Sequence, residues 1–265
     1  MTAHGFLLLY ATLLGLLVGS YLNVLIYRLP RGISTVLPAS RCPHCRARIR
    51  PWHNVPLAGY LILGGRCRSC HAPIHWRYPL VEALSGGAFA ASFAAFGASL
   101  EAAVAAAFCA AMIVLAAIDL EHHRLPDRIT LPGLVLGLAL SPWLAWSGFR
   151  AAVLGAALGA ALLSAASALW FLLRGVPGVG LGDVKMLAMV GAVLGWPEVV
   201  VTLAGASALG ALVGLAGLLL GRLGMQSRLP FGAFMAPAAI AALFFGPQLL
   251  AAYGALAPAI DPGFR

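Results

Sequence analysis

The sequence predicts an all-α polytopic membrane protein with about eight transmembrane helices. Hydrophobic residues make up 62% of the 265 residues and charged residues only 9%, whereas a soluble domain carries roughly 25% charged residues. Mean hydropathy is +0.94. The apolar residues gather into runs close to the ~20 residues that span a bilayer. So much apolar surface cannot be hidden in one soluble core, so lipid must be part of the solvent.

The first apolar segment, residues 1–27, contains no Asp, Glu, Lys or Arg and predicts a spanning helix over about 5–27. It lacks the basic beginning and the small-residue cleavage site of a signal peptide, so we expect a retained helix. Residues 28–78 form the one long polar stretch, with nine arginines, six prolines and four of the five cysteines. We expect this stretch to fold as a small domain on the membrane surface, between helices 1 and 2.

The remainder of the chain predicts seven further spans. They are placed at about 79–98, 101–118, 129–147, 151–173, 184–202, 204–221 and 231–253. Because 184–202 and 204–221 are nearly continuous, a total of seven spans is an alternative. Ala and Gly recur through 151–168 and 204–217, which favours close helix packing in lipid.

The basic residues distinguish the two sides of the membrane. With the N-terminus outside, the predicted cytoplasmic loops are 28–78, 119–128, 174–183 and 222–230. These loops and their borders hold 15 of the 17 basic residues, all except Arg150 and Arg265, as the positive-inside rule requires. The net charge of +9 therefore indicates membrane orientation, and we expect no nucleic-acid partner.

Two C-x-x-C pairs lie in the polar stretch, Cys42 with Cys45 and Cys67 with Cys70. This spacing is typical of a zinc site with four thiolate ligands. Such a site has no open position for catalysis, so the metal would fold a segment too small to hold itself together. Disulfides are the alternative, which a reducing cytoplasm disfavours. The prediction is a small zinc-binding cytoplasmic domain.

Several other polar residues are expected to have structural roles. His44, His71 and His75 could replace a cysteine ligand, but we expect surface positions for them. Cys109, alone in an apolar run, is expected to serve packing. Asp127 follows a proline and precedes an apolar run, which suits a helix N-cap. Three acids lie near the predicted membrane face opposite to the cytoplasm and are expected at solvated helix ends: Glu101, Glu198 and Asp261.

Asp119 and Asp183 stand out because each lies at an end of an apolar run, on the same predicted face. Charges at membrane depth are costly and are usually functional. Two adjacent carboxyls cannot easily both ionise. One can then take a proton from water while the other polarises a carbonyl, which would hydrolyse a peptide bond. Paired structural groups, or carboxylates bonded to nearby arginines, are the alternative.

These motifs together resemble the prepilin peptidases, also called type IV leader peptidases. G-L-G-D at 180–183 resembles the G-x-G-D signature of intramembrane aspartyl proteases, and D-L-E-H-H-R-L-P-D at 119–127 resembles the family's first-aspartate motif. The two cysteine pairs resemble those of the family. Further similar segments, in order through roughly 15–240, lie at 19–30, 54–57, 77–82 and 229–232.

The resemblance implies a bifunctional enzyme of the bacterial inner membrane. It would cleave the basic leader of type IV prepilins or type II secretion pseudopilins on the cytoplasmic side, with Asp119 and Asp183 as the catalytic pair. It would then N-methylate the new terminus with S-adenosylmethionine, since the four cysteines are typical of members with both activities. No G-x-G-x-x-G loop is visible, so the residues that bind the methyl donor are not identified.

Three parts are therefore expected: transmembrane helix 1 over 1–27, a cytoplasmic zinc-binding loop domain over 28–78, and a transmembrane aspartyl peptidase bundle over 79–265. Two other classes of function stay open. One is a transporter with proton-relay carboxylates, although no acid lies in mid-span. The other is a non-catalytic assembly factor stabilised by zinc. Loss of prepilin cleavage in aspartate variants would separate the three.

Five residues are weaker candidates for substrate contact: Glu82, Glu121, Lys185, Gly180 and Gly182. Because a prepilin leader is basic, exposed acids at Glu82 or Glu121 would steer it to the cytoplasmic face. Glu82 could instead neutralise an arginine, and Glu121 is expected to be a surface partner for nearby basic residues. Lys185 is the one lysine of the chain. The glycines would let another backbone come close.

Overall fold

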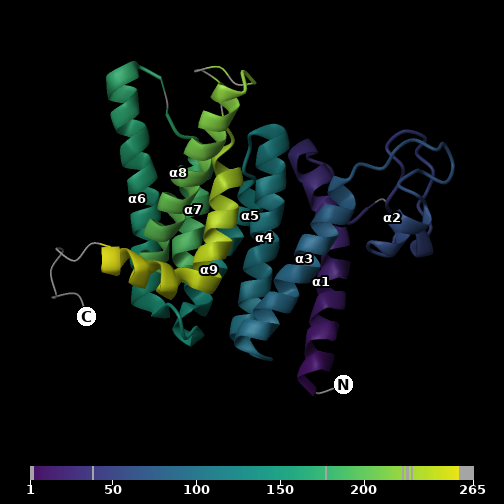
Figure 1. Ribbon diagram of the computed structural model, residues 1–265, viewed down its shortest axis with the longest axis horizontal. Coiled ribbons are helices and arrows are strands. Elements are labelled where there is room, and N and C mark those ends of the chain that lie inside the picture. The colour runs from purple at the N-terminus through teal and green to yellow at the C-terminus, as the bar shows by residue number, and fades with distance from the viewer. Residues whose placement is uncertain are drawn as a thin grey trace. The chain divides into compact units, whose positions relative to one another are not determined.

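The computed structural model describes residues 3–37, 39–176, 178–222, 224, 227 and 229–256. Within these ranges the ordered segments are helices (Figure 1) and there is no β-strand. Two isolated bridges, Arg41 with Arg48 and Arg66 with Pro73, are the only strand-like pairings in the described part. The prediction of an all-α membrane protein is confirmed. The chain forms two compact units, Met1–Pro126 and Asp127–Arg265, and each is described by itself.

The first unit contains three long helices and the polar loop domain. Its elements are α1 (Ala3–Arg28), η1 (Leu29–Arg31), η2 (Pro51–His53), α2 (Ala58–Ile62), α3 (Arg77–Phe96) and α4 (Leu100–His122). Helices α1 and α3 approach closely because α1 carries glycines at the contact. A Cβ added to Gly19 would lie 2.7 Å from the Cα of Glu82. Helix α4 begins with an N-cap, since the Ala102 N–H donates to Ser99 Oγ at 3.2 Å.

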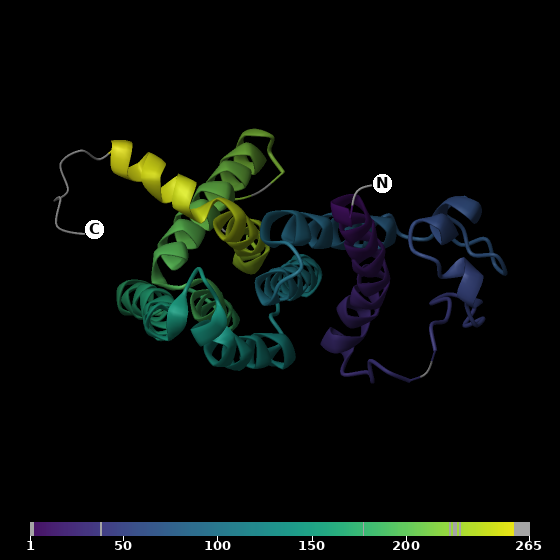
Figure 2. The same ribbon diagram turned by 90° about the horizontal axis from the view of Figure 1, so that it is seen from below.

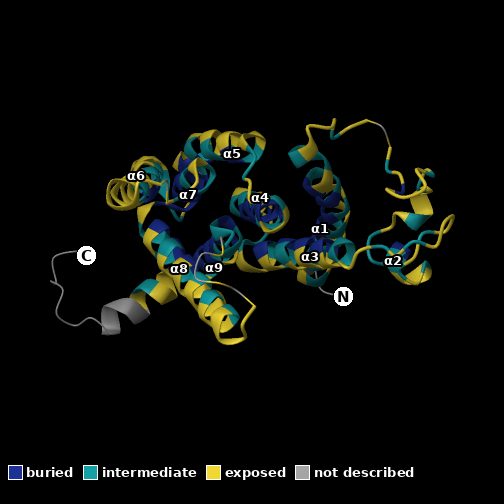
Figure 3. Cartoon of the chain, turned by 90° about the horizontal axis from the view of Figure 1, so that it is seen from above, coloured by how far each residue is buried: buried dark blue, intermediate teal, exposed yellow. Residues whose placement is uncertain are grey.

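The second unit contains the remaining helices, arranged around a buried α7. Its elements are α5 (Asp127–Leu140), η3 (Ser141–Trp143), α6 (Gly148–Arg174), α7 (Leu181–Leu194), α8 (Trp196–Leu219) and α9 (Phe231–Leu256). Every residue from 186 to 194 is buried, and α7 appears mostly dark blue in Figure 3. Helices α8 and α9 cross (Figure 2), with Gly205 against Ala238.

Among the described residues, six helices are long and apolar enough to cross a membrane. These spans are His4–Arg31, Arg77–Phe96, Leu100–His122, Gly148–Arg174, Trp196–Leu219 and Phe231–Ala251. Helices α5 and α7 have 14 residues each, which is about 21 Å of helix against a hydrocarbon core of about 30 Å. The predicted count of eight spans is therefore not confirmed.

The predicted boundary between residues 202 and 204 is wrong. Helix α8 runs without a break from Trp196 to Leu219, and the chain instead breaks at Gly195, which has a φ of 104°. Pro197 lies in the first turn of α8, where its missing N–H costs no helical hydrogen bond. Hydropathy alone could not place this break, because apolar residues continue on both sides of it and Glu198 is the one charged residue between 186 and 221.

Candidate functional site

The four cysteines of the loop domain lie on two turns that have the same backbone hydrogen bonds. In the first, the Cys42 N–H donates to Ala47 O at 2.9 Å and Arg46 N–H to Cys42 O at 2.9 Å. In the second, the Cys67 N–H donates to Ala72 O at 2.8 Å and the His71 N–H to Cys67 O at 2.9 Å. Arg46 and His71 both have a positive φ, 58° and 55°. The loop domain is thus built on a repeated cysteine turn.

These turns bring the four sulfurs together. All four Sγ atoms lie within 4.8 Å of one another, and Cys42 Sγ lies 3.8 Å from Cys70 Sγ. A tetrahedral zinc with Zn–S bonds of ~2.3 Å has S···S edges of about 3.8 Å. All five cysteines are free thiols, so the disulfide alternative is not supported. The cluster can hold a metal ion, and structural zinc is the proposal that its chemistry favours.

Backbone donors already favour a thiolate in the cluster. The pKa of Cys67 is lowered to about 6, because the N–H groups of Cys70 and Ser69 donate to its sulfur. The pKa of Cys70 is raised to about 11: the Ala72 N–H lowers it, but desolvation and the neighbouring cysteine sulfurs outweigh that effect. A bound cation would lower the pKa of every thiol in the cluster, including Cys70, since a metal deprotonates its thiol ligands.

The remaining candidate ligands lie elsewhere. His44, His71 and His75 are exposed, and none belongs to the group of four sulfurs. His75 Nδ1 instead accepts a hydrogen bond from the Arg77 N–H at 3.1 Å. Cys109 is 0% exposed, as expected for a packing residue.

We expect Cys42→Ser to lose the bound metal. The parent should retain about one zinc per chain after dialysis, because four thiolates bind zinc strongly. The variant should retain at most about a tenth of that amount, measured by elemental analysis of the purified protein. Cys109→Ala is the matched control and should keep the parent's metal content. A parent chain without metal, or a Cys42→Ser variant with full zinc, would contradict the proposed ligand set.

Asp119 lies in the last turn of α4 and is 5% exposed. The helix ends just beyond it, where His123 takes a left-handed conformation with a φ of 49° and its N–H donates to Asp119 O at 2.9 Å. The preceding turns are apolar, and Leu115 and Ile118 in them are fully buried. A carboxylate is therefore held at the end of a membrane-spanning helix, next to a sharp change in chain direction.

Asp183 lies in the first turn of α7, where a helix N-terminus favours a carboxylate. Its N–H donates to Gly180 O at 3.1 Å. A Cβ added to Gly180 would lie 3.3 Å from Asp183 Oδ2, so the glycine leaves room for the carboxylate. The preceding loop is tied to α6, since Ser167 Oγ donates to Val179 O at 3.3 Å. Ser167 was not singled out in the sequence, although it is a polar residue in an apolar run.

Two of the weaker candidates for substrate contact, Glu121 and Lys185, form ion pairs with other described residues. Glu121 pairs with Arg77, at the start of α3. Lys185 Nζ donates to both carboxylate oxygens of Asp127 at 2.8 Å, which joins the N-terminal parts of α5 and α7. Gly182, between Leu181 and Asp183, is partly exposed.

The expectation that Glu82 is an exposed acid is wrong. Glu82 is only 8% exposed, and its Oε2 accepts a hydrogen bond from the Leu57 N–H at 2.8 Å. The carboxylate therefore holds a backbone segment of the loop domain against α3. In this position it cannot steer a basic leader from solvent.

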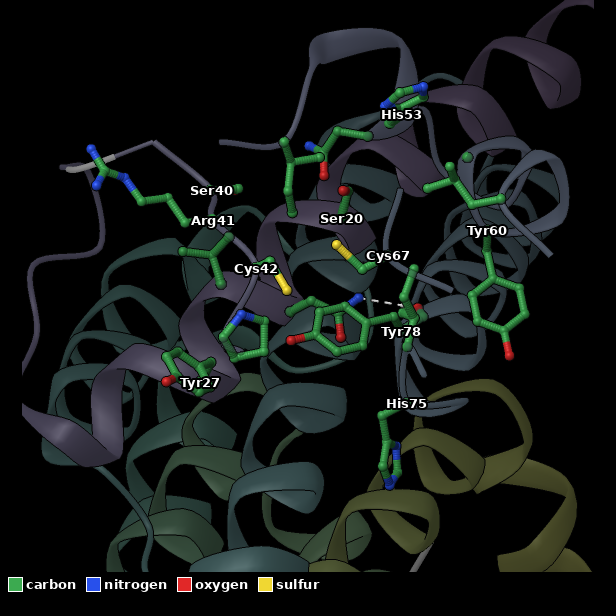
Figure 4. A pocket seen from close by; sticks show the side chains of 18 of the residues that line it. Ser20, Tyr27, Ser40, Arg41, Cys42, His53, Tyr60, Cys67, His75 and Tyr78 are labelled. Carbon is green, nitrogen blue, oxygen red and sulfur yellow. Dashed lines mark hydrogen bonds between the residues drawn. The ribbon is translucent and has the colours of Figure 1, made fainter. Parts of the chain in front are cut away.

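A cavity of about 1260 Å³ lies within the first unit. Its lining comes from the end of α1, the loop domain, the start of α3 and Glu121 of α4, and includes Cys42, Cys67 and Glu82. Figure 4 shows Tyr27, Tyr78 and Cys42 around it, together with the hydrogen bond that Asn23 donates to the Tyr78 carbonyl.

Comparison with known proteins assigns the family. Residues 13–96 match the bacterial peptidase A24 N-terminal domain, and residues 106–215 match the type IV leader peptidase family. A prepilin leader peptidase/N-methyltransferase of Burkholderia pseudomallei is 42% identical, over 91% of this chain and 86% of its own. This chain belongs to the type IV leader peptidase family. The resemblance inferred from the motifs is confirmed.

Two further relatives carry the same name. The proteins of Pseudomonas putida and Pseudomonas aeruginosa are 40% and 37% identical, each over 91% of both chains. No solved structure matches this leader peptidase. The cysteine cluster lies in the first matched segment, and Asp119 and Asp183 lie in the second. The two aspartates belong to different units, and their pairing stays a prediction.

Proposed function

We propose that this leader peptidase cleaves the leader of a type IV prepilin or secretion pseudopilin and then methylates the new N-terminus. The observation that carries the proposal is the relatives' shared name, prepilin leader peptidase/N-methyltransferase, at up to 42% identity over nearly the whole chain. The transporter and assembly-factor alternatives have no such support.

Asp119 and Asp183 are proposed as the two carboxyls that carry out cleavage. One carboxylate takes a proton from the attacking water, and the other carboxyl polarises the peptide carbonyl and later protonates the leaving amine. Their local structure suits this role, because each lies at a helix end within a membrane-embedded unit. Neither step requires a metal or a nucleophilic side chain.

The order of the two reactions follows from nitrogen chemistry. Before cleavage the future N-terminus is an amide, whose lone pair is delocalised into the carbonyl. Cleavage releases an amine that can accept a methyl group. S-adenosylmethionine supplies this group when bound: its S–CH₃ bond breaks as the N–C bond forms, and the amine then loses a proton.

The orientation in the membrane is also part of the proposal. The arginine-rich loop domain, Asp119 and Asp183 would face the cytoplasm, with the N-terminus periplasmic, because 15 of the 17 basic residues border these loops. A prepilin could then present its basic leader in the cytoplasm while its apolar helix stays in lipid. Zinc in the cysteine cluster would stabilise the loop domain.

One incubation tests the proposal. The purified full chain in detergent is mixed with a prepilin and S-adenosylmethionine labelled in its methyl group, and the products are identified by mass spectrometry. Release of the leader, with label only on the shortened pilin, supports both activities. An intact prepilin would end the peptidase assignment, and a cleaved but unlabelled pilin would end the methyltransferase assignment.

A further inference from the structure

The cavity of the first unit has a polar floor that the cleavage mechanism does not use. Asn23 of α1 is 3% exposed and lines it. Its Nδ2 donates to Gly19 O at 3.3 Å and to Tyr78 O at 3.1 Å. Its Oδ1 is buried and receives no hydrogen bond from the described residues. An orphaned buried acceptor is costly, so it indicates a ligand that donates a hydrogen bond here.

Glu82 provides a second acceptor on the same floor. Its carboxylate is buried, and the Leu57 N–H occupies one of its acceptor positions at 2.8 Å, while a carboxylate offers about four. Leu57 is the centre of a γ-turn with a φ of 59°, closed by the Ala58 N–H on Pro56 O at 2.6 Å. This conformation is rare and strained. The loop is therefore held in a specific shape around the buried Glu82 side chain.

The rest of the lining restricts the occupant. Eight arginines and two glutamates line the cavity, so a basic prepilin leader would be repelled. An anionic lipid headgroup would meet the buried Glu82 carboxylate at the floor. Three tyrosines, Tyr27, Tyr60 and Tyr78, also line it and supply aromatic faces. The occupant should combine a carboxylate, an aromatic ring and hydrogen-bond donors or a cation.

We propose that this cavity, with Asn23 and Glu82 at its floor, binds S-adenosylmethionine as the methyl donor. The inference rests on the proposed methyltransferase function and names its site. The donor's ribose hydroxyls or ammonium group meet the Glu82 carboxylate and Asn23 Oδ1. Its carboxylate meets the arginine rim. Its adenine and its sulfonium, a cation, meet tyrosine faces. The volume of about 1260 Å³ exceeds the ~300–1,000 Å³ of ordinary small-molecule pockets.

The location also relates the metal cluster to methyl transfer. Cys42 and Cys67 belong to the cavity lining, so the folded cysteine turns form part of its wall. The methyl-donor site then lies in the first unit, in the segment that matches the N-terminal domain. Asp183 lies in the other unit.

The test measures binding, with S-adenosylhomocysteine as the probe and the detergent-solubilised full chain titrated by calorimetry. Glu82→Gln removes the charge but keeps an oxygen for the Leu57 N–H. We expect it to weaken probe binding at least about tenfold, the loss expected for a charge-assisted hydrogen bond. Glu101→Gln is the same change in the first turn of α4, at a residue outside the cavity lining, and it should stay within about twofold of the parent. Equal affinity in Glu82→Gln and parent would overturn the proposal.

A second measurement uses only the parent chain and therefore tests the proposal even if Glu82→Gln fails to fold. Ultraviolet cross-linking of labelled S-adenosylmethionine to the parent should mark peptides within residues 20–31 or 39–82. Label confined to residues 127–222 would overturn the inference. So would displacement of the probe by phosphatidylglycerol vesicles but not by S-adenosylmethionine. If the parent cleaves and methylates prepilin while these binding tests fail, only the proposed methyl-donor site is contradicted. If the parent has neither activity, the proposed function itself is contradicted.

Discussion

Asp119→Asn is expected to lower the rate of prepilin cleavage by at least about a thousandfold, and Asp183→Asn by a similar factor. Asparagine has the size of aspartate but can neither accept the proton of the attacking water nor donate one to the leaving amine. The double variant should be little slower than either single variant, because the two carboxyls act as one unit. Cleavage rates come from the shift in prepilin mass on gels.

Glu101→Gln is the matched control for Asp119→Asn, since both residues lie on α4, at opposite ends. It should cleave at the parent rate. Both aspartate variants should still bind S-adenosylhomocysteine with parent affinity and should methylate a pilin supplied without its leader. Cleavage at more than about a tenth of the parent rate in either aspartate variant would remove that residue from the catalytic pair.

Gly191→Ala is expected to destabilise the second unit by about 3 kcal/mol or more, the upper range for overpacking a core. A Cβ at Gly191 would overlap the carbonyl of Gly155, and one at Gly155 would lie 2.5 Å from Gly191 O. Gly159 continues the contact, with its Cβ position 2.6 Å from Leu187 O. The backbones of α6 and α7 therefore touch, and a side chain added here would push apart α6 and the helix that carries Asp183. Thermal unfolding followed by circular dichroism measures the effect.

Gly87→Ala is the control for this prediction. Gly87 lies on an exposed face of α3, and a Cβ there would meet nothing within 4 Å. The change should leave the melting temperature unchanged or raise it slightly, because alanine favours helix by about 1 kcal/mol over glycine. Equal melting of the two variants would mean that the close approach of α6 and α7 does not limit stability.

The sequence predicted the long helices well because lipid requires long apolar runs. The first span was expected over 5–27 and α1 covers Ala3–Arg28; the last was expected over 231–253 and α9 covers Phe231–Leu256. The break at Gly195 was missed because it falls inside an apolar segment that only Glu198 interrupts. The local signal was present, since Gly195 and Pro197 flank a tryptophan and both residues favour a helix boundary.

The candidate site was predictable where chemistry depends on residue type and spacing. The C-x-x-C spacing predicted the sulfur cluster. The alanines at 47 and 72, each five residues after the first cysteine of a pair, also indicate that the two turns match. The role of Glu82 was not predictable, because its burial depends on a contact with Leu57, 25 residues away. Asn23 was missed for the same reason. Both residues lie in segments that resemble the family, 19–30 and 77–82, but their contacts with Tyr78 and Leu57 depend on the folded loop domain.

The central claim, that Asp119 and Asp183 act together, is tested most directly by cross-linking. A chain carrying Asp119→Cys and Asp183→Cys, in a Cys109→Ala background, is treated in membranes with a short bifunctional thiol reagent and digested between the two positions. We predict a covalent link that mass spectrometry places between positions 119 and 183, so that a link from one of the four loop cysteines is not counted. The control pair, Glu101→Cys with Asp183→Cys, should give none, since 18 residues of α4 place Glu101 about 27 Å from Asp119. A link in the control pair but not in the aspartate pair would contradict the account.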